Sequence, residues 1–133
     1  LGEPISGMPK HNMYLAADYT ATLGEYLINW HLDWVYTSER QTDIDGPSLP
    51  VLPYDPSKVK GLTDDNRIDS YSLMNARVSF LPEDGNYRIT AYVDNLLDEE
   101  YLLGIGGQAM AVGSPIANRG LPRMFGVEFN YQF

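Results

Sequence analysis

Chemically versatile side chains are few in this sequence. The 133 residues include two histidines, His11 and His31, and no cysteine. The absence of cysteine removes disulfides, thiolate metal ligands and cysteine nucleophiles together. The two histidines are far apart in the sequence, so they would form a metal site only if the fold carried them to carboxylates. We therefore predict no metal site, and we expect His31 to be a polar residue on a strand.

The acidic residues offer two weak candidates for a cation site. The segment 43–46, Asp-Ile-Asp-Gly, partly resembles a calcium loop. It lacks the third oxygen ligand before the glycine and the glutamate that such a loop carries further on. Asp64, Asp65 and Asp69 form the second candidate. Turn chemistry and solvation account for both groups more simply than a bound cation does.

Enzyme motifs are not recognisable either. The glycines at 104–107 lack the third spaced glycine of a dinucleotide loop and do not open a helix. No serine stands in the context of a nucleophile elbow. Asp94 and Asp98 could be read as an acid and a base, but nothing marks their separation as catalytic. We predict that the chain is not an enzyme and uses no cofactor.

Composition excludes several classes of protein. The net charge is -9 and the pI is about 4.4, so nucleic acid is an unsuitable partner, since phosphate contacts need lysine and arginine. The chain is 44% hydrophobic and 12% aromatic, which is too apolar for a disordered chain. The mean hydropathy is -0.29, and no apolar run approaches the ~18 residues of a membrane helix.

Five segments alternate between apolar and polar residues, which is typical of half-buried β-strands. We predict strands at about 11–20, 26–38, 71–81, 87–95 and 122–133. One face of these strands is apolar or aromatic: Met13, Leu15, Ala17, Tyr19, Tyr26, Ile28, Trp30, Leu32, Trp34, Tyr36, Met74, Ala76, Val78, Phe80, Tyr87, Ile89, Ala91, Val93, Phe125, Val127, Phe129, Tyr131 and Phe133. The opposite face carries Asp18, Asp33, Arg77, Arg88, Asp94 and Glu128.

Short and long connections alternate between these strands. Gly24 punctuates the first short connection, and Asp84-Gly85 provides positive φ for a two-residue hairpin turn in the second. That turn would place Ser79 opposite Thr90 and Phe80 opposite Ile89, so that polar meets polar and apolar meets apolar. The segments 40–70 and 102–121 show no periodicity, and we predict that both are long loops.

Alternation alone does not separate a soluble sandwich from a membrane barrel, but three features favour the barrel. Short turns oppose long loops, the strand lengths match the ~9–11 residues that a tilted strand needs to cross a bilayer, and aromatic residues recur near the short turns. We expect these aromatics at one level: Tyr19, Tyr26, Phe80, Tyr87, Tyr131 and Phe133. Five strands do not close a spanning barrel, so we expect a piece of a larger chain. The start at Leu1 without a leader agrees.

Two stretches of the second half resemble a known family. Residues 94–101, Asp-Asn-Leu-Leu-Asp-Glu-Glu-Tyr, resemble the "NLfDkeY" motif of TonB-dependent outer-membrane receptors. Residues 121–133 resemble the terminal "pPRtfgvslsYrF" of that family, and segments 9–11 and 71–77 resemble its "PkH" and "Y.llNar.sY". Leu97, Met124 and Gln132 depart from the usual residues. The matching motif positions are Asp94, Asn95, Leu96, Asp98, Tyr101, Pro122 and Arg123.

The resemblance implies the last strands of a barrel of about 22 strands with a plugged lumen. It implies active uptake of a scarce nutrient across the outer membrane of a Gram-negative bacterium, typically a ferric siderophore or cobalamin, sometimes a glycan. Its partners would be outer-membrane lipid, the rest of its own barrel and plug, TonB, the barrel-assembly machinery and a small ligand, which the loops 40–70 and 102–121 would contact. The assembly signal would comprise Phe125, Val127, Phe129, Tyr131 and Phe133.

Two other functions stay open at this point. A soluble extracellular β-sandwich could bind carbohydrate, with Trp30 and Trp34 as stacking platforms. On the membrane interpretation these two residues face lipid, because they share parity with Ile28 and Leu32. An outer-membrane enzyme of barrel form would need a catalytic constellation, and we find none in the sequence.

Overall fold

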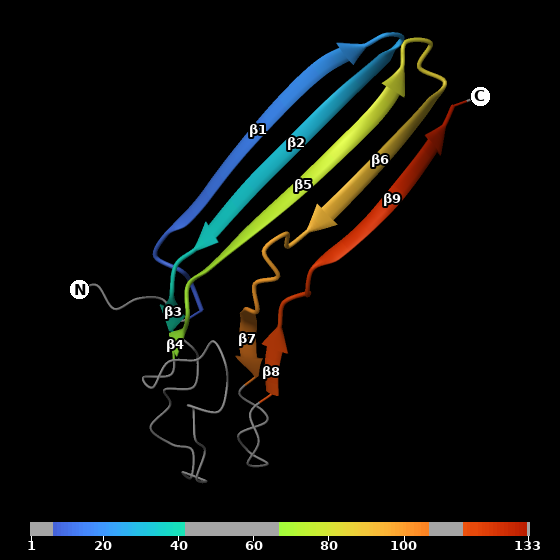
Figure 1. Ribbon diagram of the computed structural model, residues 1–133. Helices are drawn as coiled ribbons and strands as arrows, with labels where there is room; N and C mark the ends of the chain where they lie inside the picture. The colour runs from blue at the N-terminus through green and yellow to red at the C-terminus, as the bar shows by residue number, and fades with distance from the viewer. Residues whose placement is uncertain (1–6, 42–66, 107–115, 133) are drawn as a thin grey trace, which may run out of the picture. The chain divides into compact units, whose positions relative to one another are not determined.

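The computed structural model describes residues 7–41, 67–106 and 116–132, and this part of the chain is all-β. Its main element is an antiparallel five-stranded sheet in the order β1-β2-β5-β6-β9 (Figure 1). Among the described residues no helix is long and apolar enough to cross a membrane. The strands of the sheet are β1 (Asn12–Leu23), β2 (Tyr26–Thr37), β5 (Tyr71–Pro82), β6 (Tyr87–Asp94) and β9 (Met124–Tyr131).

The chain divides into two compact units. We call the first the sheet unit; it comprises Met13–Val35, Ser72–Glu99 and Pro122–Phe133. We call the second the loop unit; it comprises Leu1–Asn12, Tyr36–Tyr71 and Glu100–Leu121. Each unit is described by itself below.

The predicted alternation and hairpin register are confirmed in the sheet unit. Ser79 lies opposite Thr90, and their hydroxyl oxygens are 3.0 Å apart. Phe80 lies opposite Ile89, as polar-to-polar and apolar-to-apolar pairing requires. The pairing of β6 with β9 also places apolar residues opposite each other, as with Ala91 and Val127.

The hairpin turns differ in detail from the prediction. Between β5 and β6 only Gly85 has positive φ, at 71°, and its N–H donates to the Pro82 carbonyl at 2.9 Å. Asp84 does not have positive φ, so within the predicted Asp84-Gly85 turn the glycine alone supplies it. The Asp84 side chain instead accepts hydrogen bonds from Asn86, as turn aspartates commonly do. Between β1 and β2, Gly24 has φ of 61°, so both strands run up to a turn of Gly24 and Glu25.

Three predicted strand ends shift for local reasons. β1 extends to Leu23 instead of residue 20 because its turn is so short. β6 ends at Asp94 because Asn95 adopts φ of 54°, a left-handed conformation that breaks a strand and that asparagine tolerates. β9 begins at Met124 because Pro122 has no N–H and the Arg123 N–H donates to a side-chain oxygen instead.

One face of the sheet unit is apolar and uncovered by any described residue. We call it the apolar face; it consists of the apolar-face positions predicted above that lie within the sheet unit, at 13–34, 74–93 and 125–131. Leu15 and Tyr19 are each 66% exposed, Val127 is 73% exposed and Phe125 is 85% exposed. Ile28, in the interior strand β2, is 7% exposed and is the one buried hydrophobic residue of the described sheet unit. The sheet therefore presents a broad apolar surface where a second layer would pack in a sandwich.

The aromatic residues of this face do not all lie at one level. Tyr87 faces Tyr131 directly, its ring centroid is 6.2 Å from that of Phe129, and it lines the same hollow as Tyr26. Tyr19 does not belong to this group, because β1 continues four residues past it to Leu23. The predicted aromatic level is therefore wrong for Tyr19.

The loop unit contains strands where long loops were predicted. β3 (Arg40–Gln41) pairs with β4 (Arg67–Ile68), and β7 (Leu102–Gly106) pairs with β8 (Ile116–Arg119). The prediction of irregular loops over the whole of 40–70 and 102–121 is wrong at these strands; residues 42–66 and 107–115 lie outside the described part. The β7–β8 ladder contains a bulge, both strands are short, and β7 contains two glycines. Such strands give too few side chains to show a period.

A glycine on β9 accommodates an aromatic ring from β6. Gly126 lies opposite Tyr92, and a Cβ built on Gly126 would be 2.6 Å from the tyrosine oxygen. The ring therefore covers the glycine, an arrangement that restores the packing a strand glycine lacks. Tyr92 also lies beneath the Arg77 guanidinium, 5.9 Å from ring centroid to Cζ.

We expect Gly126→Ala to lower the free energy of unfolding by about 1 kcal/mol, because the new methyl displaces the Tyr92 ring. The cost should largely vanish in a Tyr92→Ala background, and the coupling is measured by a double-mutant cycle of urea unfolding. Gly104→Ala is the matched control, since a Cβ there meets nothing within 4 Å. Equal costs of Gly126→Ala in both backgrounds would contradict this packing.

Candidate functional site

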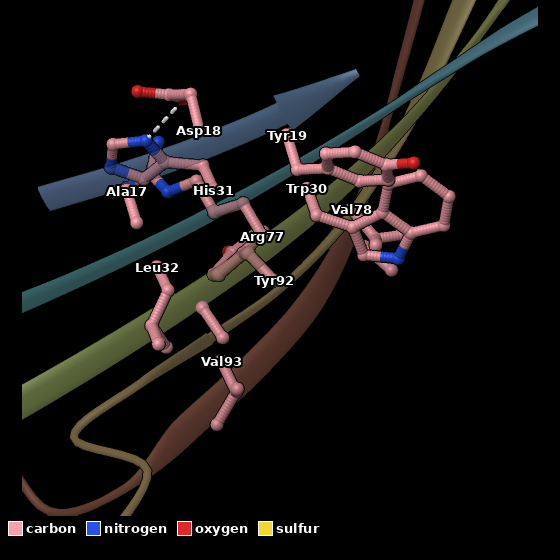
Figure 2. Close-up of a pocket in the computed structure, with 12 residues that line it drawn as sticks. Ala17, Asp18, Tyr19, Trp30, His31, Leu32, Arg77, Val78, Tyr92 and Val93 are labelled. Atoms are coloured by element: carbon pink, nitrogen blue, oxygen red, sulfur yellow. Dashed lines mark hydrogen bonds and ion pairs between the residues drawn. The ribbon is translucent and has the colours of Figure 1, made fainter. Parts of the chain in front are cut away.

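The apolar face contains a hollow lined by small side chains and flanked by aromatic ones. Its volume is about 520 Å³. Ala17, Ala76 and Ala91 contribute the small side chains, and Tyr19 and Trp30 lie together beside them with ring centroids 5.5 Å apart (Figure 2). Trp30 thus pairs with another ring on the apolar face, at 40% exposure. Its surroundings offer hydrocarbon contact and few hydrogen-bonding partners, which suits an apolar environment.

On the opposite, polar face of the sheet unit, hydrogen bonds and one ion contact connect side chains across three strands. Asp18 of β1 contacts His31 of β2 at 2.8 Å (Figure 2). The other ring nitrogen of His31 lies 3.4 Å from Asp33. The second oxygen of Asp33 accepts a hydrogen bond from the Asn75 amide of β5 at 2.8 Å. His31 is therefore a polar-face residue, as predicted.

The series of contacts that includes Asp33 and Asn75 continues into the turn after β6, where the family-like motif begins. The Asn95 N–H donates to Asn75 Oδ1 at 2.9 Å. The Asn95 side chain bonds both backbone groups of Glu99, accepting from its N–H and donating to its carbonyl, each at 2.9 Å. Asn95 is only 5% exposed. The motif asparagine thus closes the turn that follows β6.

Asp98 joins the two family-like stretches. It has φ of 56°, and its Oδ1 accepts the backbone N–H of Arg123 at 3.0 Å. The Arg123 guanidinium lies 3.7 Å from Asp98 and donates to the Leu96 carbonyl at 3.4 Å. Both side chains of the ion pair are about half exposed, so solvent weakens their attraction. The hydrogen bond from the Arg123 N–H therefore contributes more to the stability of this contact than the ion pair does. The Pro-Arg step is thereby held against the motif turn just before β9 begins.

Tyr101 belongs to the loop unit and packs there. Its ring lies 4.5 Å from that of Tyr71 between centroids, and a Cβ on Gly120 would collide with it. Its carbonyl accepts the Gly120 N–H at 2.9 Å. In the same unit, Arg40 donates to the carbonyls of Leu102 and Leu103 at 3.2 and 2.7 Å. These contacts connect segments that are about 60 residues apart in the sequence.

The residues predicted as an assembly signal lie on one edge strand. Phe125, Val127, Phe129 and Tyr131 all point to the apolar face from β9, and Phe133 lies outside the described residues. β9 pairs with β6 along one edge, and within the described chain no strand pairs with its other edge. β1 is the second edge strand of the sheet.

The remaining candidates are not brought together. Among the described residues no group of three or more histidine, aspartate or glutamate side chains is placed to hold a metal ion. The segment 43–46 and the pair Asp64 and Asp65 lie outside the described part. His11 is in the loop unit, where its backbone N–H donates to Ser38 Oγ. Asp94 and Asp98 serve different partners, Arg77 at 3.9 Å and Arg123 respectively.

Sequence reasoning missed the links through Asn75 and Glu99. Asn75 was visible only as one polar residue of an alternating strand. The available signal was the asparagine at 95 directly after a strand, since asparagine both tolerates left-handed backbone and bonds a nearby main chain.

No protein-family model, curated protein or solved structure matches the chain.

Proposed function

We propose that this chain is part of the barrel wall of a TonB-dependent outer-membrane receptor, a transporter and not an enzyme. Such a receptor would bind a scarce nutrient, a ferric siderophore, cobalamin or a similar small molecule, and import it with energy supplied through TonB. Its setting would be the outer membrane of a Gram-negative bacterium, with lipid on one face of the sheet. The barrel-assembly machinery would read β9, and the remaining barrel and plug would complete the fold.

The observation that carries this proposal is the apolar face of the sheet unit. Large side chains such as Leu15, Phe125 and Val127 are mostly exposed on the edge strands β1 and β9, and several on β2, β5 and β6 are about 40% exposed. Soluble monomers rarely expose contiguous apolar patches beyond a few hundred Å². A lipid environment stabilises such a face without a second protein layer, whereas water does not.

The polar face supports the same proposal. Several of its charged groups are paired: His31 contacts Asp18 and Asp33, and Arg77 contacts Asp94. A barrel interior is polar and wet, and it tolerates this pattern. The motif stretches at 94–101 and 121–133 support the family, because in this chain they interlock through Asp98 and Arg123.

Carbohydrate binding by Trp30 in a soluble sandwich has less support. Trp30 lies among alanines, valines and Tyr19 on the apolar face. A sugar site needs polar groups that converge on the ligand beside the aromatic platform. Asp18 and His31 bond each other instead.

Spin labelling tests which medium the apolar face meets. The chain has no cysteine, so a nitroxide placed on Val127→Cys reports from a single site in this region. We expect a high collision rate with oxygen, which concentrates in lipid, and a low rate with a water-soluble nickel complex. Asn130→Cys, on the opposite face of the same strand, is the matched control and should collide with oxygen several-fold less often.

The experiment uses the intact protein in lipid vesicles. A label at 127 that collides mainly with the nickel complex would place this face in water. A label shielded from both reagents would place a second protein layer over it and would favour the sandwich. Either result contradicts the proposed function.

A further inference from the structure

His31 lies between two carboxylates that come from different strands. Its Nδ1 is 2.8 Å from Asp18 of β1, and its Nε2 is 3.4 Å from Asp33, two residues along β2. The side chain of Asp33 is only 13% exposed and that of His31 is 28% exposed. Both ring nitrogens therefore face an acceptor oxygen.

A neutral imidazole does not satisfy this geometry. It carries one N–H donor, and its other nitrogen presents a lone pair. In the neutral form one of the two carboxylates would face that lone pair, which is repulsive. The imidazolium form donates from both nitrogens, so it matches both carboxylates at once.

One of the two carboxylates is held in place by a neighbour, and the other polar groups nearby have partners of their own. Asn75 of β5 donates to the second oxygen of Asp33 at 2.8 Å. Asn29 of β2 is occupied with Thr20 of β1, at 2.9 Å. Arg77, the cation of β5 on this face, has its guanidinium 3.9 Å from Asp94 and over the Tyr92 ring.

We propose that His31 is a proton-binding site that links β1 to β2 through side chains of the polar face. Among the described residues β1 pairs with β2 alone, so a side-chain link from Asp18 to β2 adds to one ladder of backbone hydrogen bonds. The link is complete while the imidazole is charged, and it weakens as the pH rises and the proton is lost. Because the ordinary pKa of histidine is about 6.5, the change falls near neutral pH. This inference does not depend on the transport function or on the medium that covers the apolar face.

Hydrogen–deuterium exchange measured by mass spectrometry tests the proposal in the intact folded protein. We expect β1 amides, corrected for intrinsic exchange and compared with those of β6, to exchange about two- to fivefold faster at about pH 8 than at about pH 5.5. This is the range for a solvent-accessible ion pair. An imidazole with the ordinary pKa of about 6.5 changes its charge between these two pH values.

Variants assign the effect to the residue. His31→Gln should remove the pH difference and leave β1 at the faster rate, and Asp18→Asn should reduce the difference. The other histidine of the chain, His11, lies in the loop unit, so His11→Gln should leave the pH difference unchanged. A wild-type ratio that is equal at both pH values overturns the proposal. A pH difference that persists in His31→Gln, or that disappears in His11→Gln, overturns it as well.

Discussion

Val127→Arg is expected to destabilise the intact protein in a lipid bilayer by ~2–4 kcal/mol when position 127 lies near the membrane midplane. The wild-type side chain is 73% exposed on the apolar face of β9 and faces Ala91 of β6 across the ladder. An arginine there must hold its guanidinium in hydrocarbon or distort the bilayer to reach water. Ala91→Arg should cost a similar amount, because the two positions are paired at the same level.

The matched control is Asn130→Arg, three residues further along the same strand and on the polar face. We expect it to cost well under 1 kcal/mol, because an arginine there remains beside Glu128, whose carboxylate already accepts the Asn130 amide at 2.8 Å. Thr90 is a poorer control although it faces the same way. It is 9% exposed and its hydroxyl bonds Ser79, so Thr90→Arg would break a packed contact. Reversible urea unfolding from lipid vesicles measures these costs, and equal values for Val127→Arg and Asn130→Arg would refute the assignment of the two faces.

The strands and their faces were predictable because side-chain period carries that information directly. A period of two residues divided β1, β2, β5, β6 and β9 into an apolar and a polar face, and the register of Ser79 with Thr90 followed from one turn. The type of that turn was not predictable from Asp84 and Gly85 alone. Four residues separate β5 from β6, and the longer connection lets Gly85 supply the positive φ by itself.

The loop unit was less predictable because its strands are held by tertiary contacts and not by their own pattern. β3 and β4 are two residues each, and they are far apart in the sequence. Buried Ile68 and Leu102, and the Arg40 bonds to the carbonyls of Leu102 and Leu103, are long-range features. No local periodicity reveals contacts of that kind.

Some residues of the candidate site were predictable from the sequence, but Asn75, Glu99 and the bonds that connect the site were not. The motif residues 94–101 and the step 122–123 were identified from type and order, without a physical role for each. The structure connects them through backbone groups: Asp98 accepts the Arg123 N–H, and Asn95 bonds the main chain of Glu99. Every residue has the same backbone donor and acceptor groups, so the sequence does not indicate which backbone atom a side chain will bond.

Asn95→Ala is expected to lower the free energy of unfolding by roughly 2–5 kcal/mol. The asparagine side chain makes two hydrogen bonds to Glu99, and each is worth about 0.5–1.5 kcal/mol net. The residue is 5% exposed, so the Glu99 N–H has little access to water once its acceptor is removed. Its φ of 54° adds a further cost of about 1–2 kcal/mol, because alanine adopts the left-handed conformation less readily than asparagine.

Asn95→Gly separates these two contributions. Glycine adopts positive φ without strain but makes no side-chain hydrogen bond. We therefore expect Asn95→Gly to cost about 1–2 kcal/mol less than Asn95→Ala, with the difference measuring backbone strain. Leu97→Ala, in the same turn at 61% exposure, should cost less than about 0.5 kcal/mol and controls for general sensitivity of the region.

The order of the three variants identifies what the motif asparagine does. Alanine costing more than glycine, and both costing more than Leu97→Ala, indicates a turn fixed by φ and by hydrogen bonds together. Equal costs for alanine and glycine would mean that the left-handed backbone is unstrained, and the hydrogen bonds alone would then explain the asparagine. Costs near zero for both would contradict the network from Asn75 through Asn95 to Glu99. Chemical unfolding of the intact protein provides the measurement, and the network predicts that Asn75→Ala loses stability in the same direction, because the Asn95 N–H then loses its acceptor.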